Sequence, residues 1–206
     1  MLEKVKLMAI IREVDPDCTK KAIEILAEEG FRDFEISLSD SELGMECIRQ
    51  AQADYVGTEI HIGAGTVSAK EELDVLWELK VPYILTPGFD REIVVYARDK
   101  GFEILPGVLT PTEVGMAVNC GITRLKLFPA DAFGPGYVKG LKGPFPQTEY
   151  IAVGGVNLET AASFLENGFA GIAVGSNLVP KRAKEKDMTA IREKGRKYME
   201  IVNRFL

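Results

Sequence analysis

Apolar runs alternate with amphipathic segments along the whole chain, at a spacing of about 20 to 25 residues. The apolar runs predict strands at Val5–Arg12, Phe31–Ser39, His61–Val67, Tyr83–Pro87, Phe102–Val108, Arg124–Pro129, Tyr150–Val156 and Gly171–Val179. The segments between and after them predict helices at Asp17–Glu29, Ser41–Ala53, Ala69–Leu79, Arg91–Lys100, Pro111–Asn119, Leu158–Asn167 and Met188–Phe205. Short, mostly apolar strands separated by helices predict a parallel sheet covered by helices, an α/β fold.

Eight alternating units favour a closed (β/α)8 barrel, the TIM-barrel architecture. The chain has 206 residues, close to the lower limit of about 200 for this architecture, so we expect one compact domain over residues 1–206. An open doubly wound sheet is the alternative, but it would carry a glycine-rich nucleotide fingerprint after its first strand. The sequence there is Arg12-Glu13-Val14-Asp15, which favours the barrel.

Local signals mark the ends of the predicted helices. Residues suited to a helix start stand before or at the start of these segments: Asp15, Pro16, Ser68, Asp90, Thr110, Pro111 and Asn157. Glycines suited to a helix end follow them: Gly30, Gly101, Gly121 and Gly168. These signals agree with the hydrophobic pattern.

The composition is that of a globular protein, with 46% apolar residues to build a core. The chain holds 25 Lys and Arg against 31 Asp and Glu, a formal net charge of −6. It offers no basic face to nucleic acid or to an anionic membrane, so we expect neither partner. The longest apolar runs fall far short of the about 20 residues of a membrane-spanning helix, and the amino terminus lacks a signal-peptide pattern. We therefore expect a cytoplasmic protein.

Cysteine and histidine usage narrows the chemistry. Cys18, Cys47 and Cys120 share no Cys-x-x-Cys spacing, and we expect reduced thiols that are buried or half-buried. His61 is the single histidine, whereas catalytic zinc sites usually draw on two or three and the common nucleophilic triads need a histidine base. We expect no metal at the site and a structural role for His61.

Ionisable residues occupy inward positions of three predicted strands. In the second strand apolar residues alternate with Glu35 and Ser37, which points both of these side chains into the barrel. The same alternation points Lys126 inward, and Arg12 at the end of the first strand. Burying charges is costly unless they are paired or change protonation, so this convergence needs an explanation.

Two explanations follow from the residues. One is a buried salt-bridge cluster without chemistry, although such clusters add little stability and barrel active sites lie at these strand ends. The other begins with Lys126, because burial and a nearby cation lower the pKa of an amine and free it to form a Schiff base. Glu35 beside it would transfer protons. This chemistry needs neither a metal nor a cofactor.

Glycine-containing loops follow the last two predicted strands, at Gly154-Gly155 and at Gly175-Ser176. The loops after strands 7 and 8 are where barrels commonly hold phosphate, because glycines let backbone amides approach an anion. Plain turns are the alternative for either loop alone. A third element, Gly63-Ala64-Gly65-Thr66, places a hydroxyl at the end of the third strand. The alternative for its glycines is close packing of the strand against a helix.

Several short motifs follow one another in a specific order. They are Ile62–Val67, Leu105–Val108, Thr110–Glu113, Leu125–Ala130, Gly143–Pro146 and Gly154–Val156. From about Leu7 to Pro180 this order resembles the 2-keto-3-deoxy-6-phosphogluconate / 4-hydroxy-2-oxoglutarate (KDPG/KHG) aldolase family, and Leu-Lys-Leu-Phe-Pro-Ala is its most specific part. The resemblance implies a class I aldolase, a lyase, on a trimeric barrel. Its expected reaction splits 2-keto-3-deoxy-6-phosphogluconate into pyruvate and glyceraldehyde 3-phosphate, and it would also split 4-hydroxy-2-oxoglutarate into pyruvate and glyoxylate.

The resemblance implies roles residue by residue. Lys126 matches the Schiff-base lysine, Glu35 matches the general acid and base, and Thr66 matches a threonine near the pyruvate carboxylate. The residues that match the phosphate loops are Gly154, Gly155, Gly175 and Ser176.

Two positions depart from the family pattern. Many members carry an arginine four residues after the catalytic glutamate, where this chain has Ser39, and we expect Arg12 to bind the carboxylate instead. Before Gly154, phosphogluconate-type members usually show Pro-Thr, whereas this chain has Ala152-Val153. That pair resembles the branch acting on the C4 epimer, 2-keto-3-deoxy-6-phosphogalactonate. Val153 lacks a hydroxyl that could bond the sugar, and we expect this loss to relax or invert the preference at C4.

Two other functions compete with the aldolase hypothesis. One is a phosphate-binding barrel isomerase or synthase that forms no imine, and the other is a non-catalytic barrel that binds phosphosugars. Borohydride treatment in the presence of pyruvate separates them from an aldolase, because only an imine is reduced to a stable adduct. The inward Lys126 in its specific motif favours the aldolase.

Overall fold

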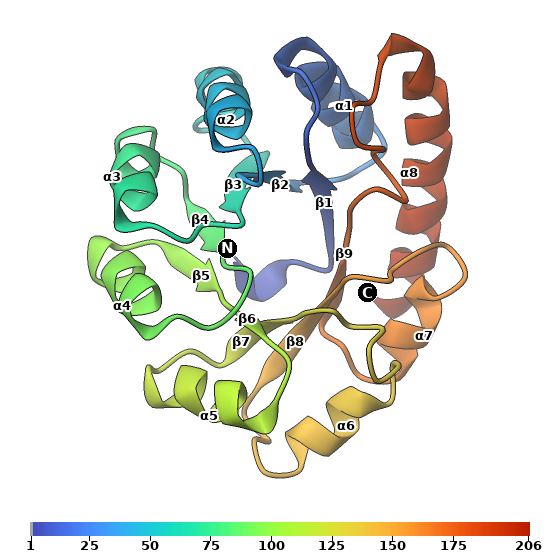
Figure 1. The fold of residues 1–206 in the computed structure, drawn as a ribbon. Helices are drawn as coiled ribbons and strands as arrows, with labels where there is room; N and C mark the ends of the chain where they lie inside the picture. The colour runs from blue at the N-terminus through green and yellow to red at the C-terminus, as the bar shows by residue number, and fades with distance from the viewer. Residues whose placement is uncertain (1) are drawn as a thin grey trace.

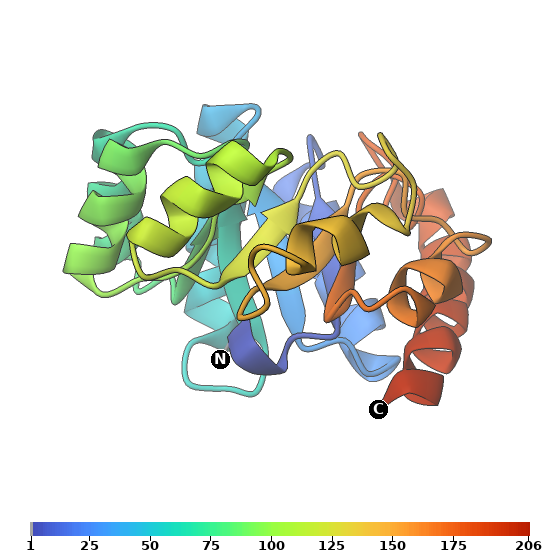
Figure 2. The same ribbon diagram turned by 90° about the horizontal axis from the view of Figure 1, so that it is seen from below.

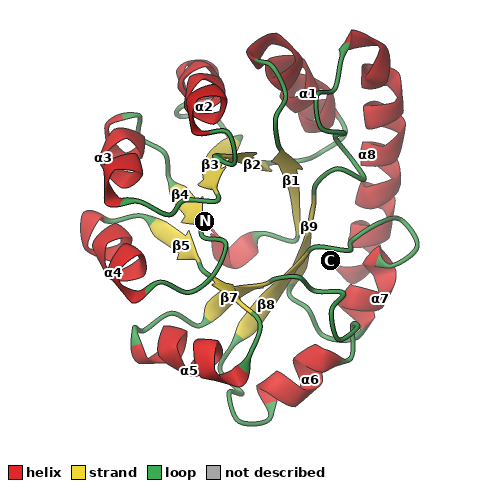
Figure 3. Cartoon of the chain, in the orientation of Figure 1, coloured by secondary structure: helices red, strands yellow, loops and turns green. Residues whose placement is uncertain are grey.

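Strands and helices alternate along the computed structural model, which describes residues 2–206. The strands are β1 (Leu7–Ile11), β2 (Asp33–Ser37), β3 (His61–Gly65), β4 (Tyr83–Leu85), β5 (Glu103–Leu105), β6 (Gly107–Val108), β7 (Arg124–Leu127), β8 (Glu149–Val153) and β9 (Gly171–Val174). The α-helices are α1 (Pro16–Glu28), α2 (Ser41–Tyr55), α3 (Lys70–Glu78), α4 (Arg91–Lys100), α5 (Pro111–Asn119), α6 (Tyr137–Lys142), α7 (Ala161–Glu166) and α8 (Met188–Val202). Short 3-10 helices are η1 (Leu2–Lys4), η2 (Glu185–Asp187) and η3 (Asn203–Phe205). Figure 3 shows the strands as an inner ring with the helices around it.

The sheet closes on itself through one interrupted strand. Its strands are parallel and follow the order β5-β4-β3-β2-β1-β9-β8-β7-β6, so β5 and β6 stand at the two ends. Only Pro106 separates β5 from β6, and its carbonyl accepts a hydrogen bond from the Lys126 amide at 3.0 Å. Proline has no N–H for the ladder, so the predicted strand Phe102–Val108 is two short strands. Together they complete the predicted eight-strand barrel (Figure 1).

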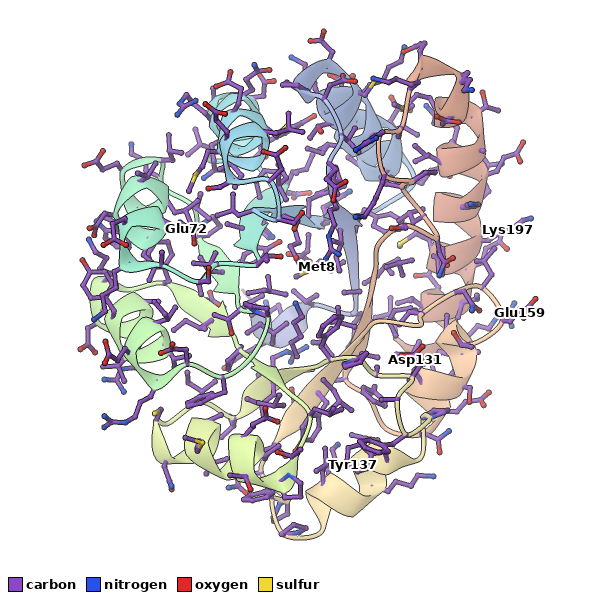
Figure 4. All side chains as sticks on the ribbon, in the orientation of Figure 1. Met8, Glu72, Asp131, Tyr137, Glu159 and Lys197 are labelled. Carbon is purple, nitrogen blue, oxygen red and sulfur yellow. The ribbon has the colours of Figure 1, made fainter. Side chains whose placement is uncertain are left out.

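Side chains of β1 alternate between two apolar clusters. Leu7 and Ile11 pack outward in a large cluster that includes helix residues, whereas Met8 and Ile10 belong to a smaller cluster inside the barrel. Figure 4 shows Met8 near the centre of the ring. Because side chains alternate along a strand, Arg12 continues the inward series at the end of β1.

The amino-terminal end of the barrel is covered by η1. Leu2 joins the inner cluster, and its amide donates to Glu103 Oε2 at 2.6 Å. Arg124 reaches the same segment, because its guanidinium donates to the carbonyls of Glu3 and Val5 at 2.7 Å each. Figure 2, turned by 90°, shows this segment at one end of the barrel. The inner cluster is therefore closed at this end, and the strands' carboxyl ends form the opposite one.

Most of the predicted helix ends are present. Asp15 and Asp90 accept hydrogen bonds from backbone amides in the first turns of α1 and α4. The glycines after four helices adopt the left-handed conformation that favours glycine: Gly30, Gly101, Gly121 and Gly168. Ser68 is not the cap of α3, because the helix begins after Ala69 and the Glu72 carboxylate accepts the amides of both residues.

Two helices differ from the prediction. Helix α6 was not predicted, because six residues between glycines are too few to show a helical period. Helix α7 is shorter than the predicted Leu158–Asn167, because Asn157 Oδ1 accepts the amides of Glu159 and Thr160 and holds those residues in a turn. Within residues 2–206, none of the helices combines the length and the apolar character needed to cross a membrane.

Candidate active site

Lys126 lies on β7 inside the barrel, because its two neighbours on the strand pack outward with the helices. It is only 4% exposed, and its Nζ lies 5.1 Å from the centre of the Phe128 ring. Burial lowers the pKa of Lys126, an effect that the Glu35 charge opposes and the Arg12 charge reinforces. Lys126 is therefore shifted toward the neutral amine, the form that attacks a carbonyl carbon.

Glu35 lies on β2 and is completely buried. Burial raises the pKa of Glu35, while the charges of Lys126 and Arg12 act in the opposite direction. Gly65 on the adjacent strand β3 makes room for the carboxyl group, since a Cβ at that position would fall 1.7 Å from Glu35 Oε1. Glu35 is therefore shifted toward the neutral acid, which can donate a proton.

The buried polar atoms of this cluster are not paired with one another. Within residues 2–206, both carboxyl oxygens of Glu35 and the Nε of Arg12 are buried without a hydrogen-bond partner. A buried salt-bridge cluster, the explanation without chemistry, would have used those atoms. Buried polar groups are usually satisfied, so open donors and acceptors at one place are typical of a site that a ligand completes.

A cavity of about 220 Å³ opens at the carboxyl ends of β1, β8 and β9. The residues predicted for the substrate site that line it are Arg12, Val153, Gly154, Gly155, Gly175 and Ser176. Lys126, Glu35 and Thr66 are not part of its wall. Phe128 connects the two regions, because it lines the cavity and its ring faces Lys126 Nζ.

The loop after β8 requires glycine. Gly154 and Gly155 have φ angles of +92° and +70°, and a Cβ on Gly155 would fall 2.3 Å from the Asp131 side chain. Figure 4 shows Asp131 on the loop that follows β7. At Gly175 a Cβ would make only ordinary contact with Ile10, at 3.8 Å, so the backbone does not demand glycine there.

Four residues that line this cavity have backbone amides that donate no hydrogen bond within residues 2–206: Gly154, Gly155, Gly175 and Ser176. Free amides at glycine loops are the groups with which a barrel binds phosphate.

Thr66 lies at the end of β3, beside a residue whose role was not predicted. Its Oγ1 is 3.0 Å from Ser37 Oγ, and the Ser39 amide donates to the same Ser37 oxygen at 3.2 Å. Alternation along β2 predicted that Ser37 points inward, but no motif assigned it a function. Ser39, where many family members carry arginine, is exposed.

A second cavity, of about 500 Å³, lies at the opposite end of the barrel and holds His61. His61 Nδ1 lies 2.9 Å from Asp33 Oδ1, which agrees with a structural role. None of the residues predicted for catalysis or substrate binding lines this cavity. The candidate active site is therefore at the carboxyl ends of the strands.

A family model described as KDPG and KHG aldolase matches residues 1–194. The chain belongs to this aldolase family. The match spans nearly the whole barrel, with both Lys126 and Glu35 inside it. It excludes the non-catalytic phosphosugar-binding barrel and the isomerase or synthase, since members of the KDPG/KHG aldolase family are lyases.

Individual relatives agree with this assignment. A 2-dehydro-3-deoxy-6-phosphogalactonate aldolase of Escherichia coli is 36% identical over 176 residues, which is 85% of each chain, where 2-dehydro is a synonym of 2-keto. A 2-dehydro-3-deoxy-phosphogluconate aldolase of Pseudomonas aeruginosa is 31% identical over 159 residues, 77% of this chain and 71% of that one. A solved structure described as native KDPGal superimposes with a TM-score of 0.85 at 31% identity, covering 98% of this chain and 96% of that one.

Proposed function

We propose that this aldolase cleaves 2-keto-3-deoxy-6-phosphogalactonate to pyruvate and glyceraldehyde 3-phosphate through a Schiff base on Lys126. The observation that carries the proposal is the buried pair of Lys126 and Glu35. Burial lowers the pKa of Lys126 and raises that of Glu35, which favours the uncharged form of each group. A neutral amine and a neutral acid in one chamber supply the nucleophile and the proton donor for imine formation from a ketone.

Imine formation comes first. The Lys126 Nζ lone pair adds to C2 of the substrate, a proton passes from the resulting ammonium nitrogen to the former ketone oxygen, and a neutral carbinolamine results. Glu35, in its acid form, protonates the C2 hydroxyl, which leaves as water while the nitrogen lone pair forms the C=N bond. The products of this step are a positively charged iminium and the Glu35 carboxylate.

Cleavage uses the carboxylate that imine formation has just produced. Glu35 accepts the proton of the C4 hydroxyl, the C3–C4 bond breaks, and its electron pair moves into the iminium to give an enamine. Glyceraldehyde 3-phosphate leaves as the aldehyde. Glu35 then returns its proton to C3, and water hydrolyses the imine to release pyruvate and Lys126. A raised pKa suits a group that must alternate between acid and base.

Both ends of the substrate have matching groups in the barrel. We assign the keto-acid carboxylate to Arg12 and the Thr66 hydroxyl, since the Arg12 Nε has no hydrogen-bond partner among residues 2–206. The phosphate is assigned to the free amides of Gly154, Gly155, Gly175 and Ser176. Binding energy at these distant groups would hold C2 near Lys126, which lowers the entropic cost of reaction.

The choice of C4 epimer rests on Val153. Sequence reasoning alone put the gluconate epimer first and the galactonate epimer second. Val153 lines the cavity, is 4% exposed and offers the sugar no hydrogen bond. The phosphogalactonate aldolase of Escherichia coli is 36% identical to this chain, against 31% for the phosphogluconate aldolase of Pseudomonas aeruginosa. Both observations favour the galactonate epimer as substrate.

We expect kcat/KM for the galactonate epimer to exceed that for the gluconate epimer by about tenfold or more, and Val153→Thr to reduce this ratio. Pyruvate release can be followed through lactate dehydrogenase and NADH. Pyruvate itself has no C4, so its half-saturating concentration in borohydride trapping should be the same for Val153→Thr and the native chain. Preference of the native chain for the gluconate epimer would contradict this proposal and support 2-keto-3-deoxy-6-phosphogluconate, the substrate expected from the sequence.

We also propose a cytoplasmic homotrimer, in keeping with the family resemblance. Phe133 at the approach to α6 is 61% exposed and packs on Tyr137, labelled in Figure 4, with ring centres 4.7 Å apart. Large exposed aromatic side chains are typical of protein interfaces. Light scattering is expected to give three times the chain mass of 22.6 kDa, and a single chain mass at micromolar concentration would contradict the trimer.

A further inference from the structure

Two hydroxyl groups meet at the carboxyl ends of β2 and β3. Ser37, the last residue of β2, is 2% exposed, and its Oγ lies 3.0 Å from Thr66 Oγ1. Thr66 has a φ angle of +63°, in the left-handed region that β-branched residues rarely adopt. Hydrogen bonds on both sides hold it there, from the Leu38 amide to the Gly65 carbonyl and from the Val67 amide to the Leu85 carbonyl. A strained backbone at a strand end is typical of a functional position.

The direction of the hydrogen bond between these hydroxyls follows from their partners. The Ser39 amide, which can only donate, already donates to Ser37 Oγ at 3.2 Å. If Thr66 also donated to Ser37, the Ser37 hydrogen would be buried without an acceptor, because residues 2–206 offer Ser37 Oγ no other partner. Ser37 therefore donates to Thr66, and the Thr66 hydrogen is free for a ligand.

We propose that Ser37 is a positioning residue, which turns the Thr66 hydroxyl into a donor toward the carboxylate of the bound keto acid. The inference rests on the proposed function, because it needs a carboxylate at Thr66. A carboxylate only accepts hydrogen bonds, so a hydroxyl held in the opposite direction would repel it. The Ser39 side chain brings no charge to this region. Its backbone amide donates to Ser37, which in turn donates to Thr66.

The expected effect is on substrate binding rather than on the chemical steps. The carboxylate is bound in the same way before, during and after bond cleavage, so losing its donor raises KM and leaves kcat nearly unchanged. A hydrogen bond to a charged group corresponds to a change of about tenfold. Ser37→Ala is therefore expected to raise the half-saturating pyruvate concentration in borohydride trapping about tenfold, with the same maximal adduct on Lys126.

A double-mutant cycle tests the dependence of Thr66 on Ser37. Trapping is measured against pyruvate concentration for the native chain, Ser37→Ala, Thr66→Val and the double variant. If Ser37 acts only through Thr66, the double variant saturates at the same pyruvate concentration as Thr66→Val. The control is Thr148→Ala, which removes a buried hydroxyl that donates to the Phe145 carbonyl beside the amino end of β8 and should saturate normally.

Each outcome decides the proposal. A Ser37→Ala protein that saturates within twofold of the native chain would overturn it, as would effects that multiply in the double variant. An equal shift in Thr148→Ala would reduce the Ser37 effect to a general loss of packing. Absence of any pyruvate adduct in the native chain would instead overturn the proposed function. If the native chain forms the adduct and Ser37→Ala saturates at the same pyruvate concentration, only the role of Ser37 is overturned.

Discussion

Borohydride reduction in the presence of pyruvate is expected to leave a reduced pyruvyl group on Lys126, detectable by mass spectrometry of the protein and of its peptides. Lys126→Ala should abolish this adduct and lower kcat by about 10⁴-fold, because the covalent electron sink forms on the amine that the substitution removes. The reason lies in the environment of the amine. Burial lowers the pKa of Lys126, so the reactive neutral form is available at a lower pH than for a solvated lysine.

Two further variants make this result specific. Lys139 on α6 is exposed, so Lys139→Ala should be trapped and should turn over like the native chain. Lys126→Met keeps most of the side-chain volume and separates loss of the amine from loss of packing. Since a buried amine with a lowered pKa costs folding free energy, Lys126→Met should not unfold at a lower temperature than the native chain. Turnover that survives in Lys126→Ala, or an adduct on another lysine, would refute the Schiff-base mechanism.

The inward positions of the site could be predicted because they interrupt apolar strands. Lys126 and Glu35 each stand between outward-facing apolar residues, and alternation along a strand then leaves them only the barrel interior. The same pattern failed at Pro106, because hydropathy does not show that a proline removes one hydrogen bond from the ladder and divides a strand. Helix α6 was missed for a related reason. It has six residues between two glycines, which is too short for a helical repeat of apolar residues to be recognised.

The finer geometry of the site depends on contacts between distant segments, which no local pattern carries. Gly155 is required because Asp131, on the preceding βα loop, occupies the space of a Cβ. Gly65 is required because Glu35 lies against it from the neighbouring strand. The link between Ser37 and Thr66 joins two strand ends that are 29 residues apart. Glycine and hydroxyl residues could be noticed in the sequence, but the reason for each is visible only in the folded barrel.

Replacing the Glu35 carboxyl by an amide is expected to separate imine formation from turnover. Glu35→Gln should still form the imine with pyruvate because Lys126 supplies the amine, although more slowly because the acid that expels the C2 hydroxyl is missing. Its kcat should fall by about 10²- to 10⁴-fold since an amide cannot accept the C4 proton. The measurements are borohydride trapping and pyruvate release on the same preparation. Turnover equal to that of the native chain would remove Glu35 from the acid and base role.

The stability of the same variant reports on the pKa of Glu35. Burial raises this pKa above the ordinary value of 4.5, so between 4.5 and the raised value the folded protein binds more protons than the unfolded chain. The free energy of unfolding of the native chain therefore falls as pH rises through that window, and a neutral amide has no such fall. Glu35→Gln is expected to be more stable than the native chain above the window and equal to it below 4.5, as measured by denaturant unfolding at several pH values.

Asp33→Asn is the matched control, because Asp33 lies on the same strand at the amino end of the barrel. Burial also raises the pKa of Asp33, while its partner His61 acts in the opposite direction. Its amide variant is therefore expected to change the pH dependence of stability without changing kcat. If both variants lost turnover, the loss in Glu35→Gln would reflect damage to β2. If only Glu35→Gln loses turnover while gaining stability, the buried carboxyl is a group that weakens the fold and serves proton transfer.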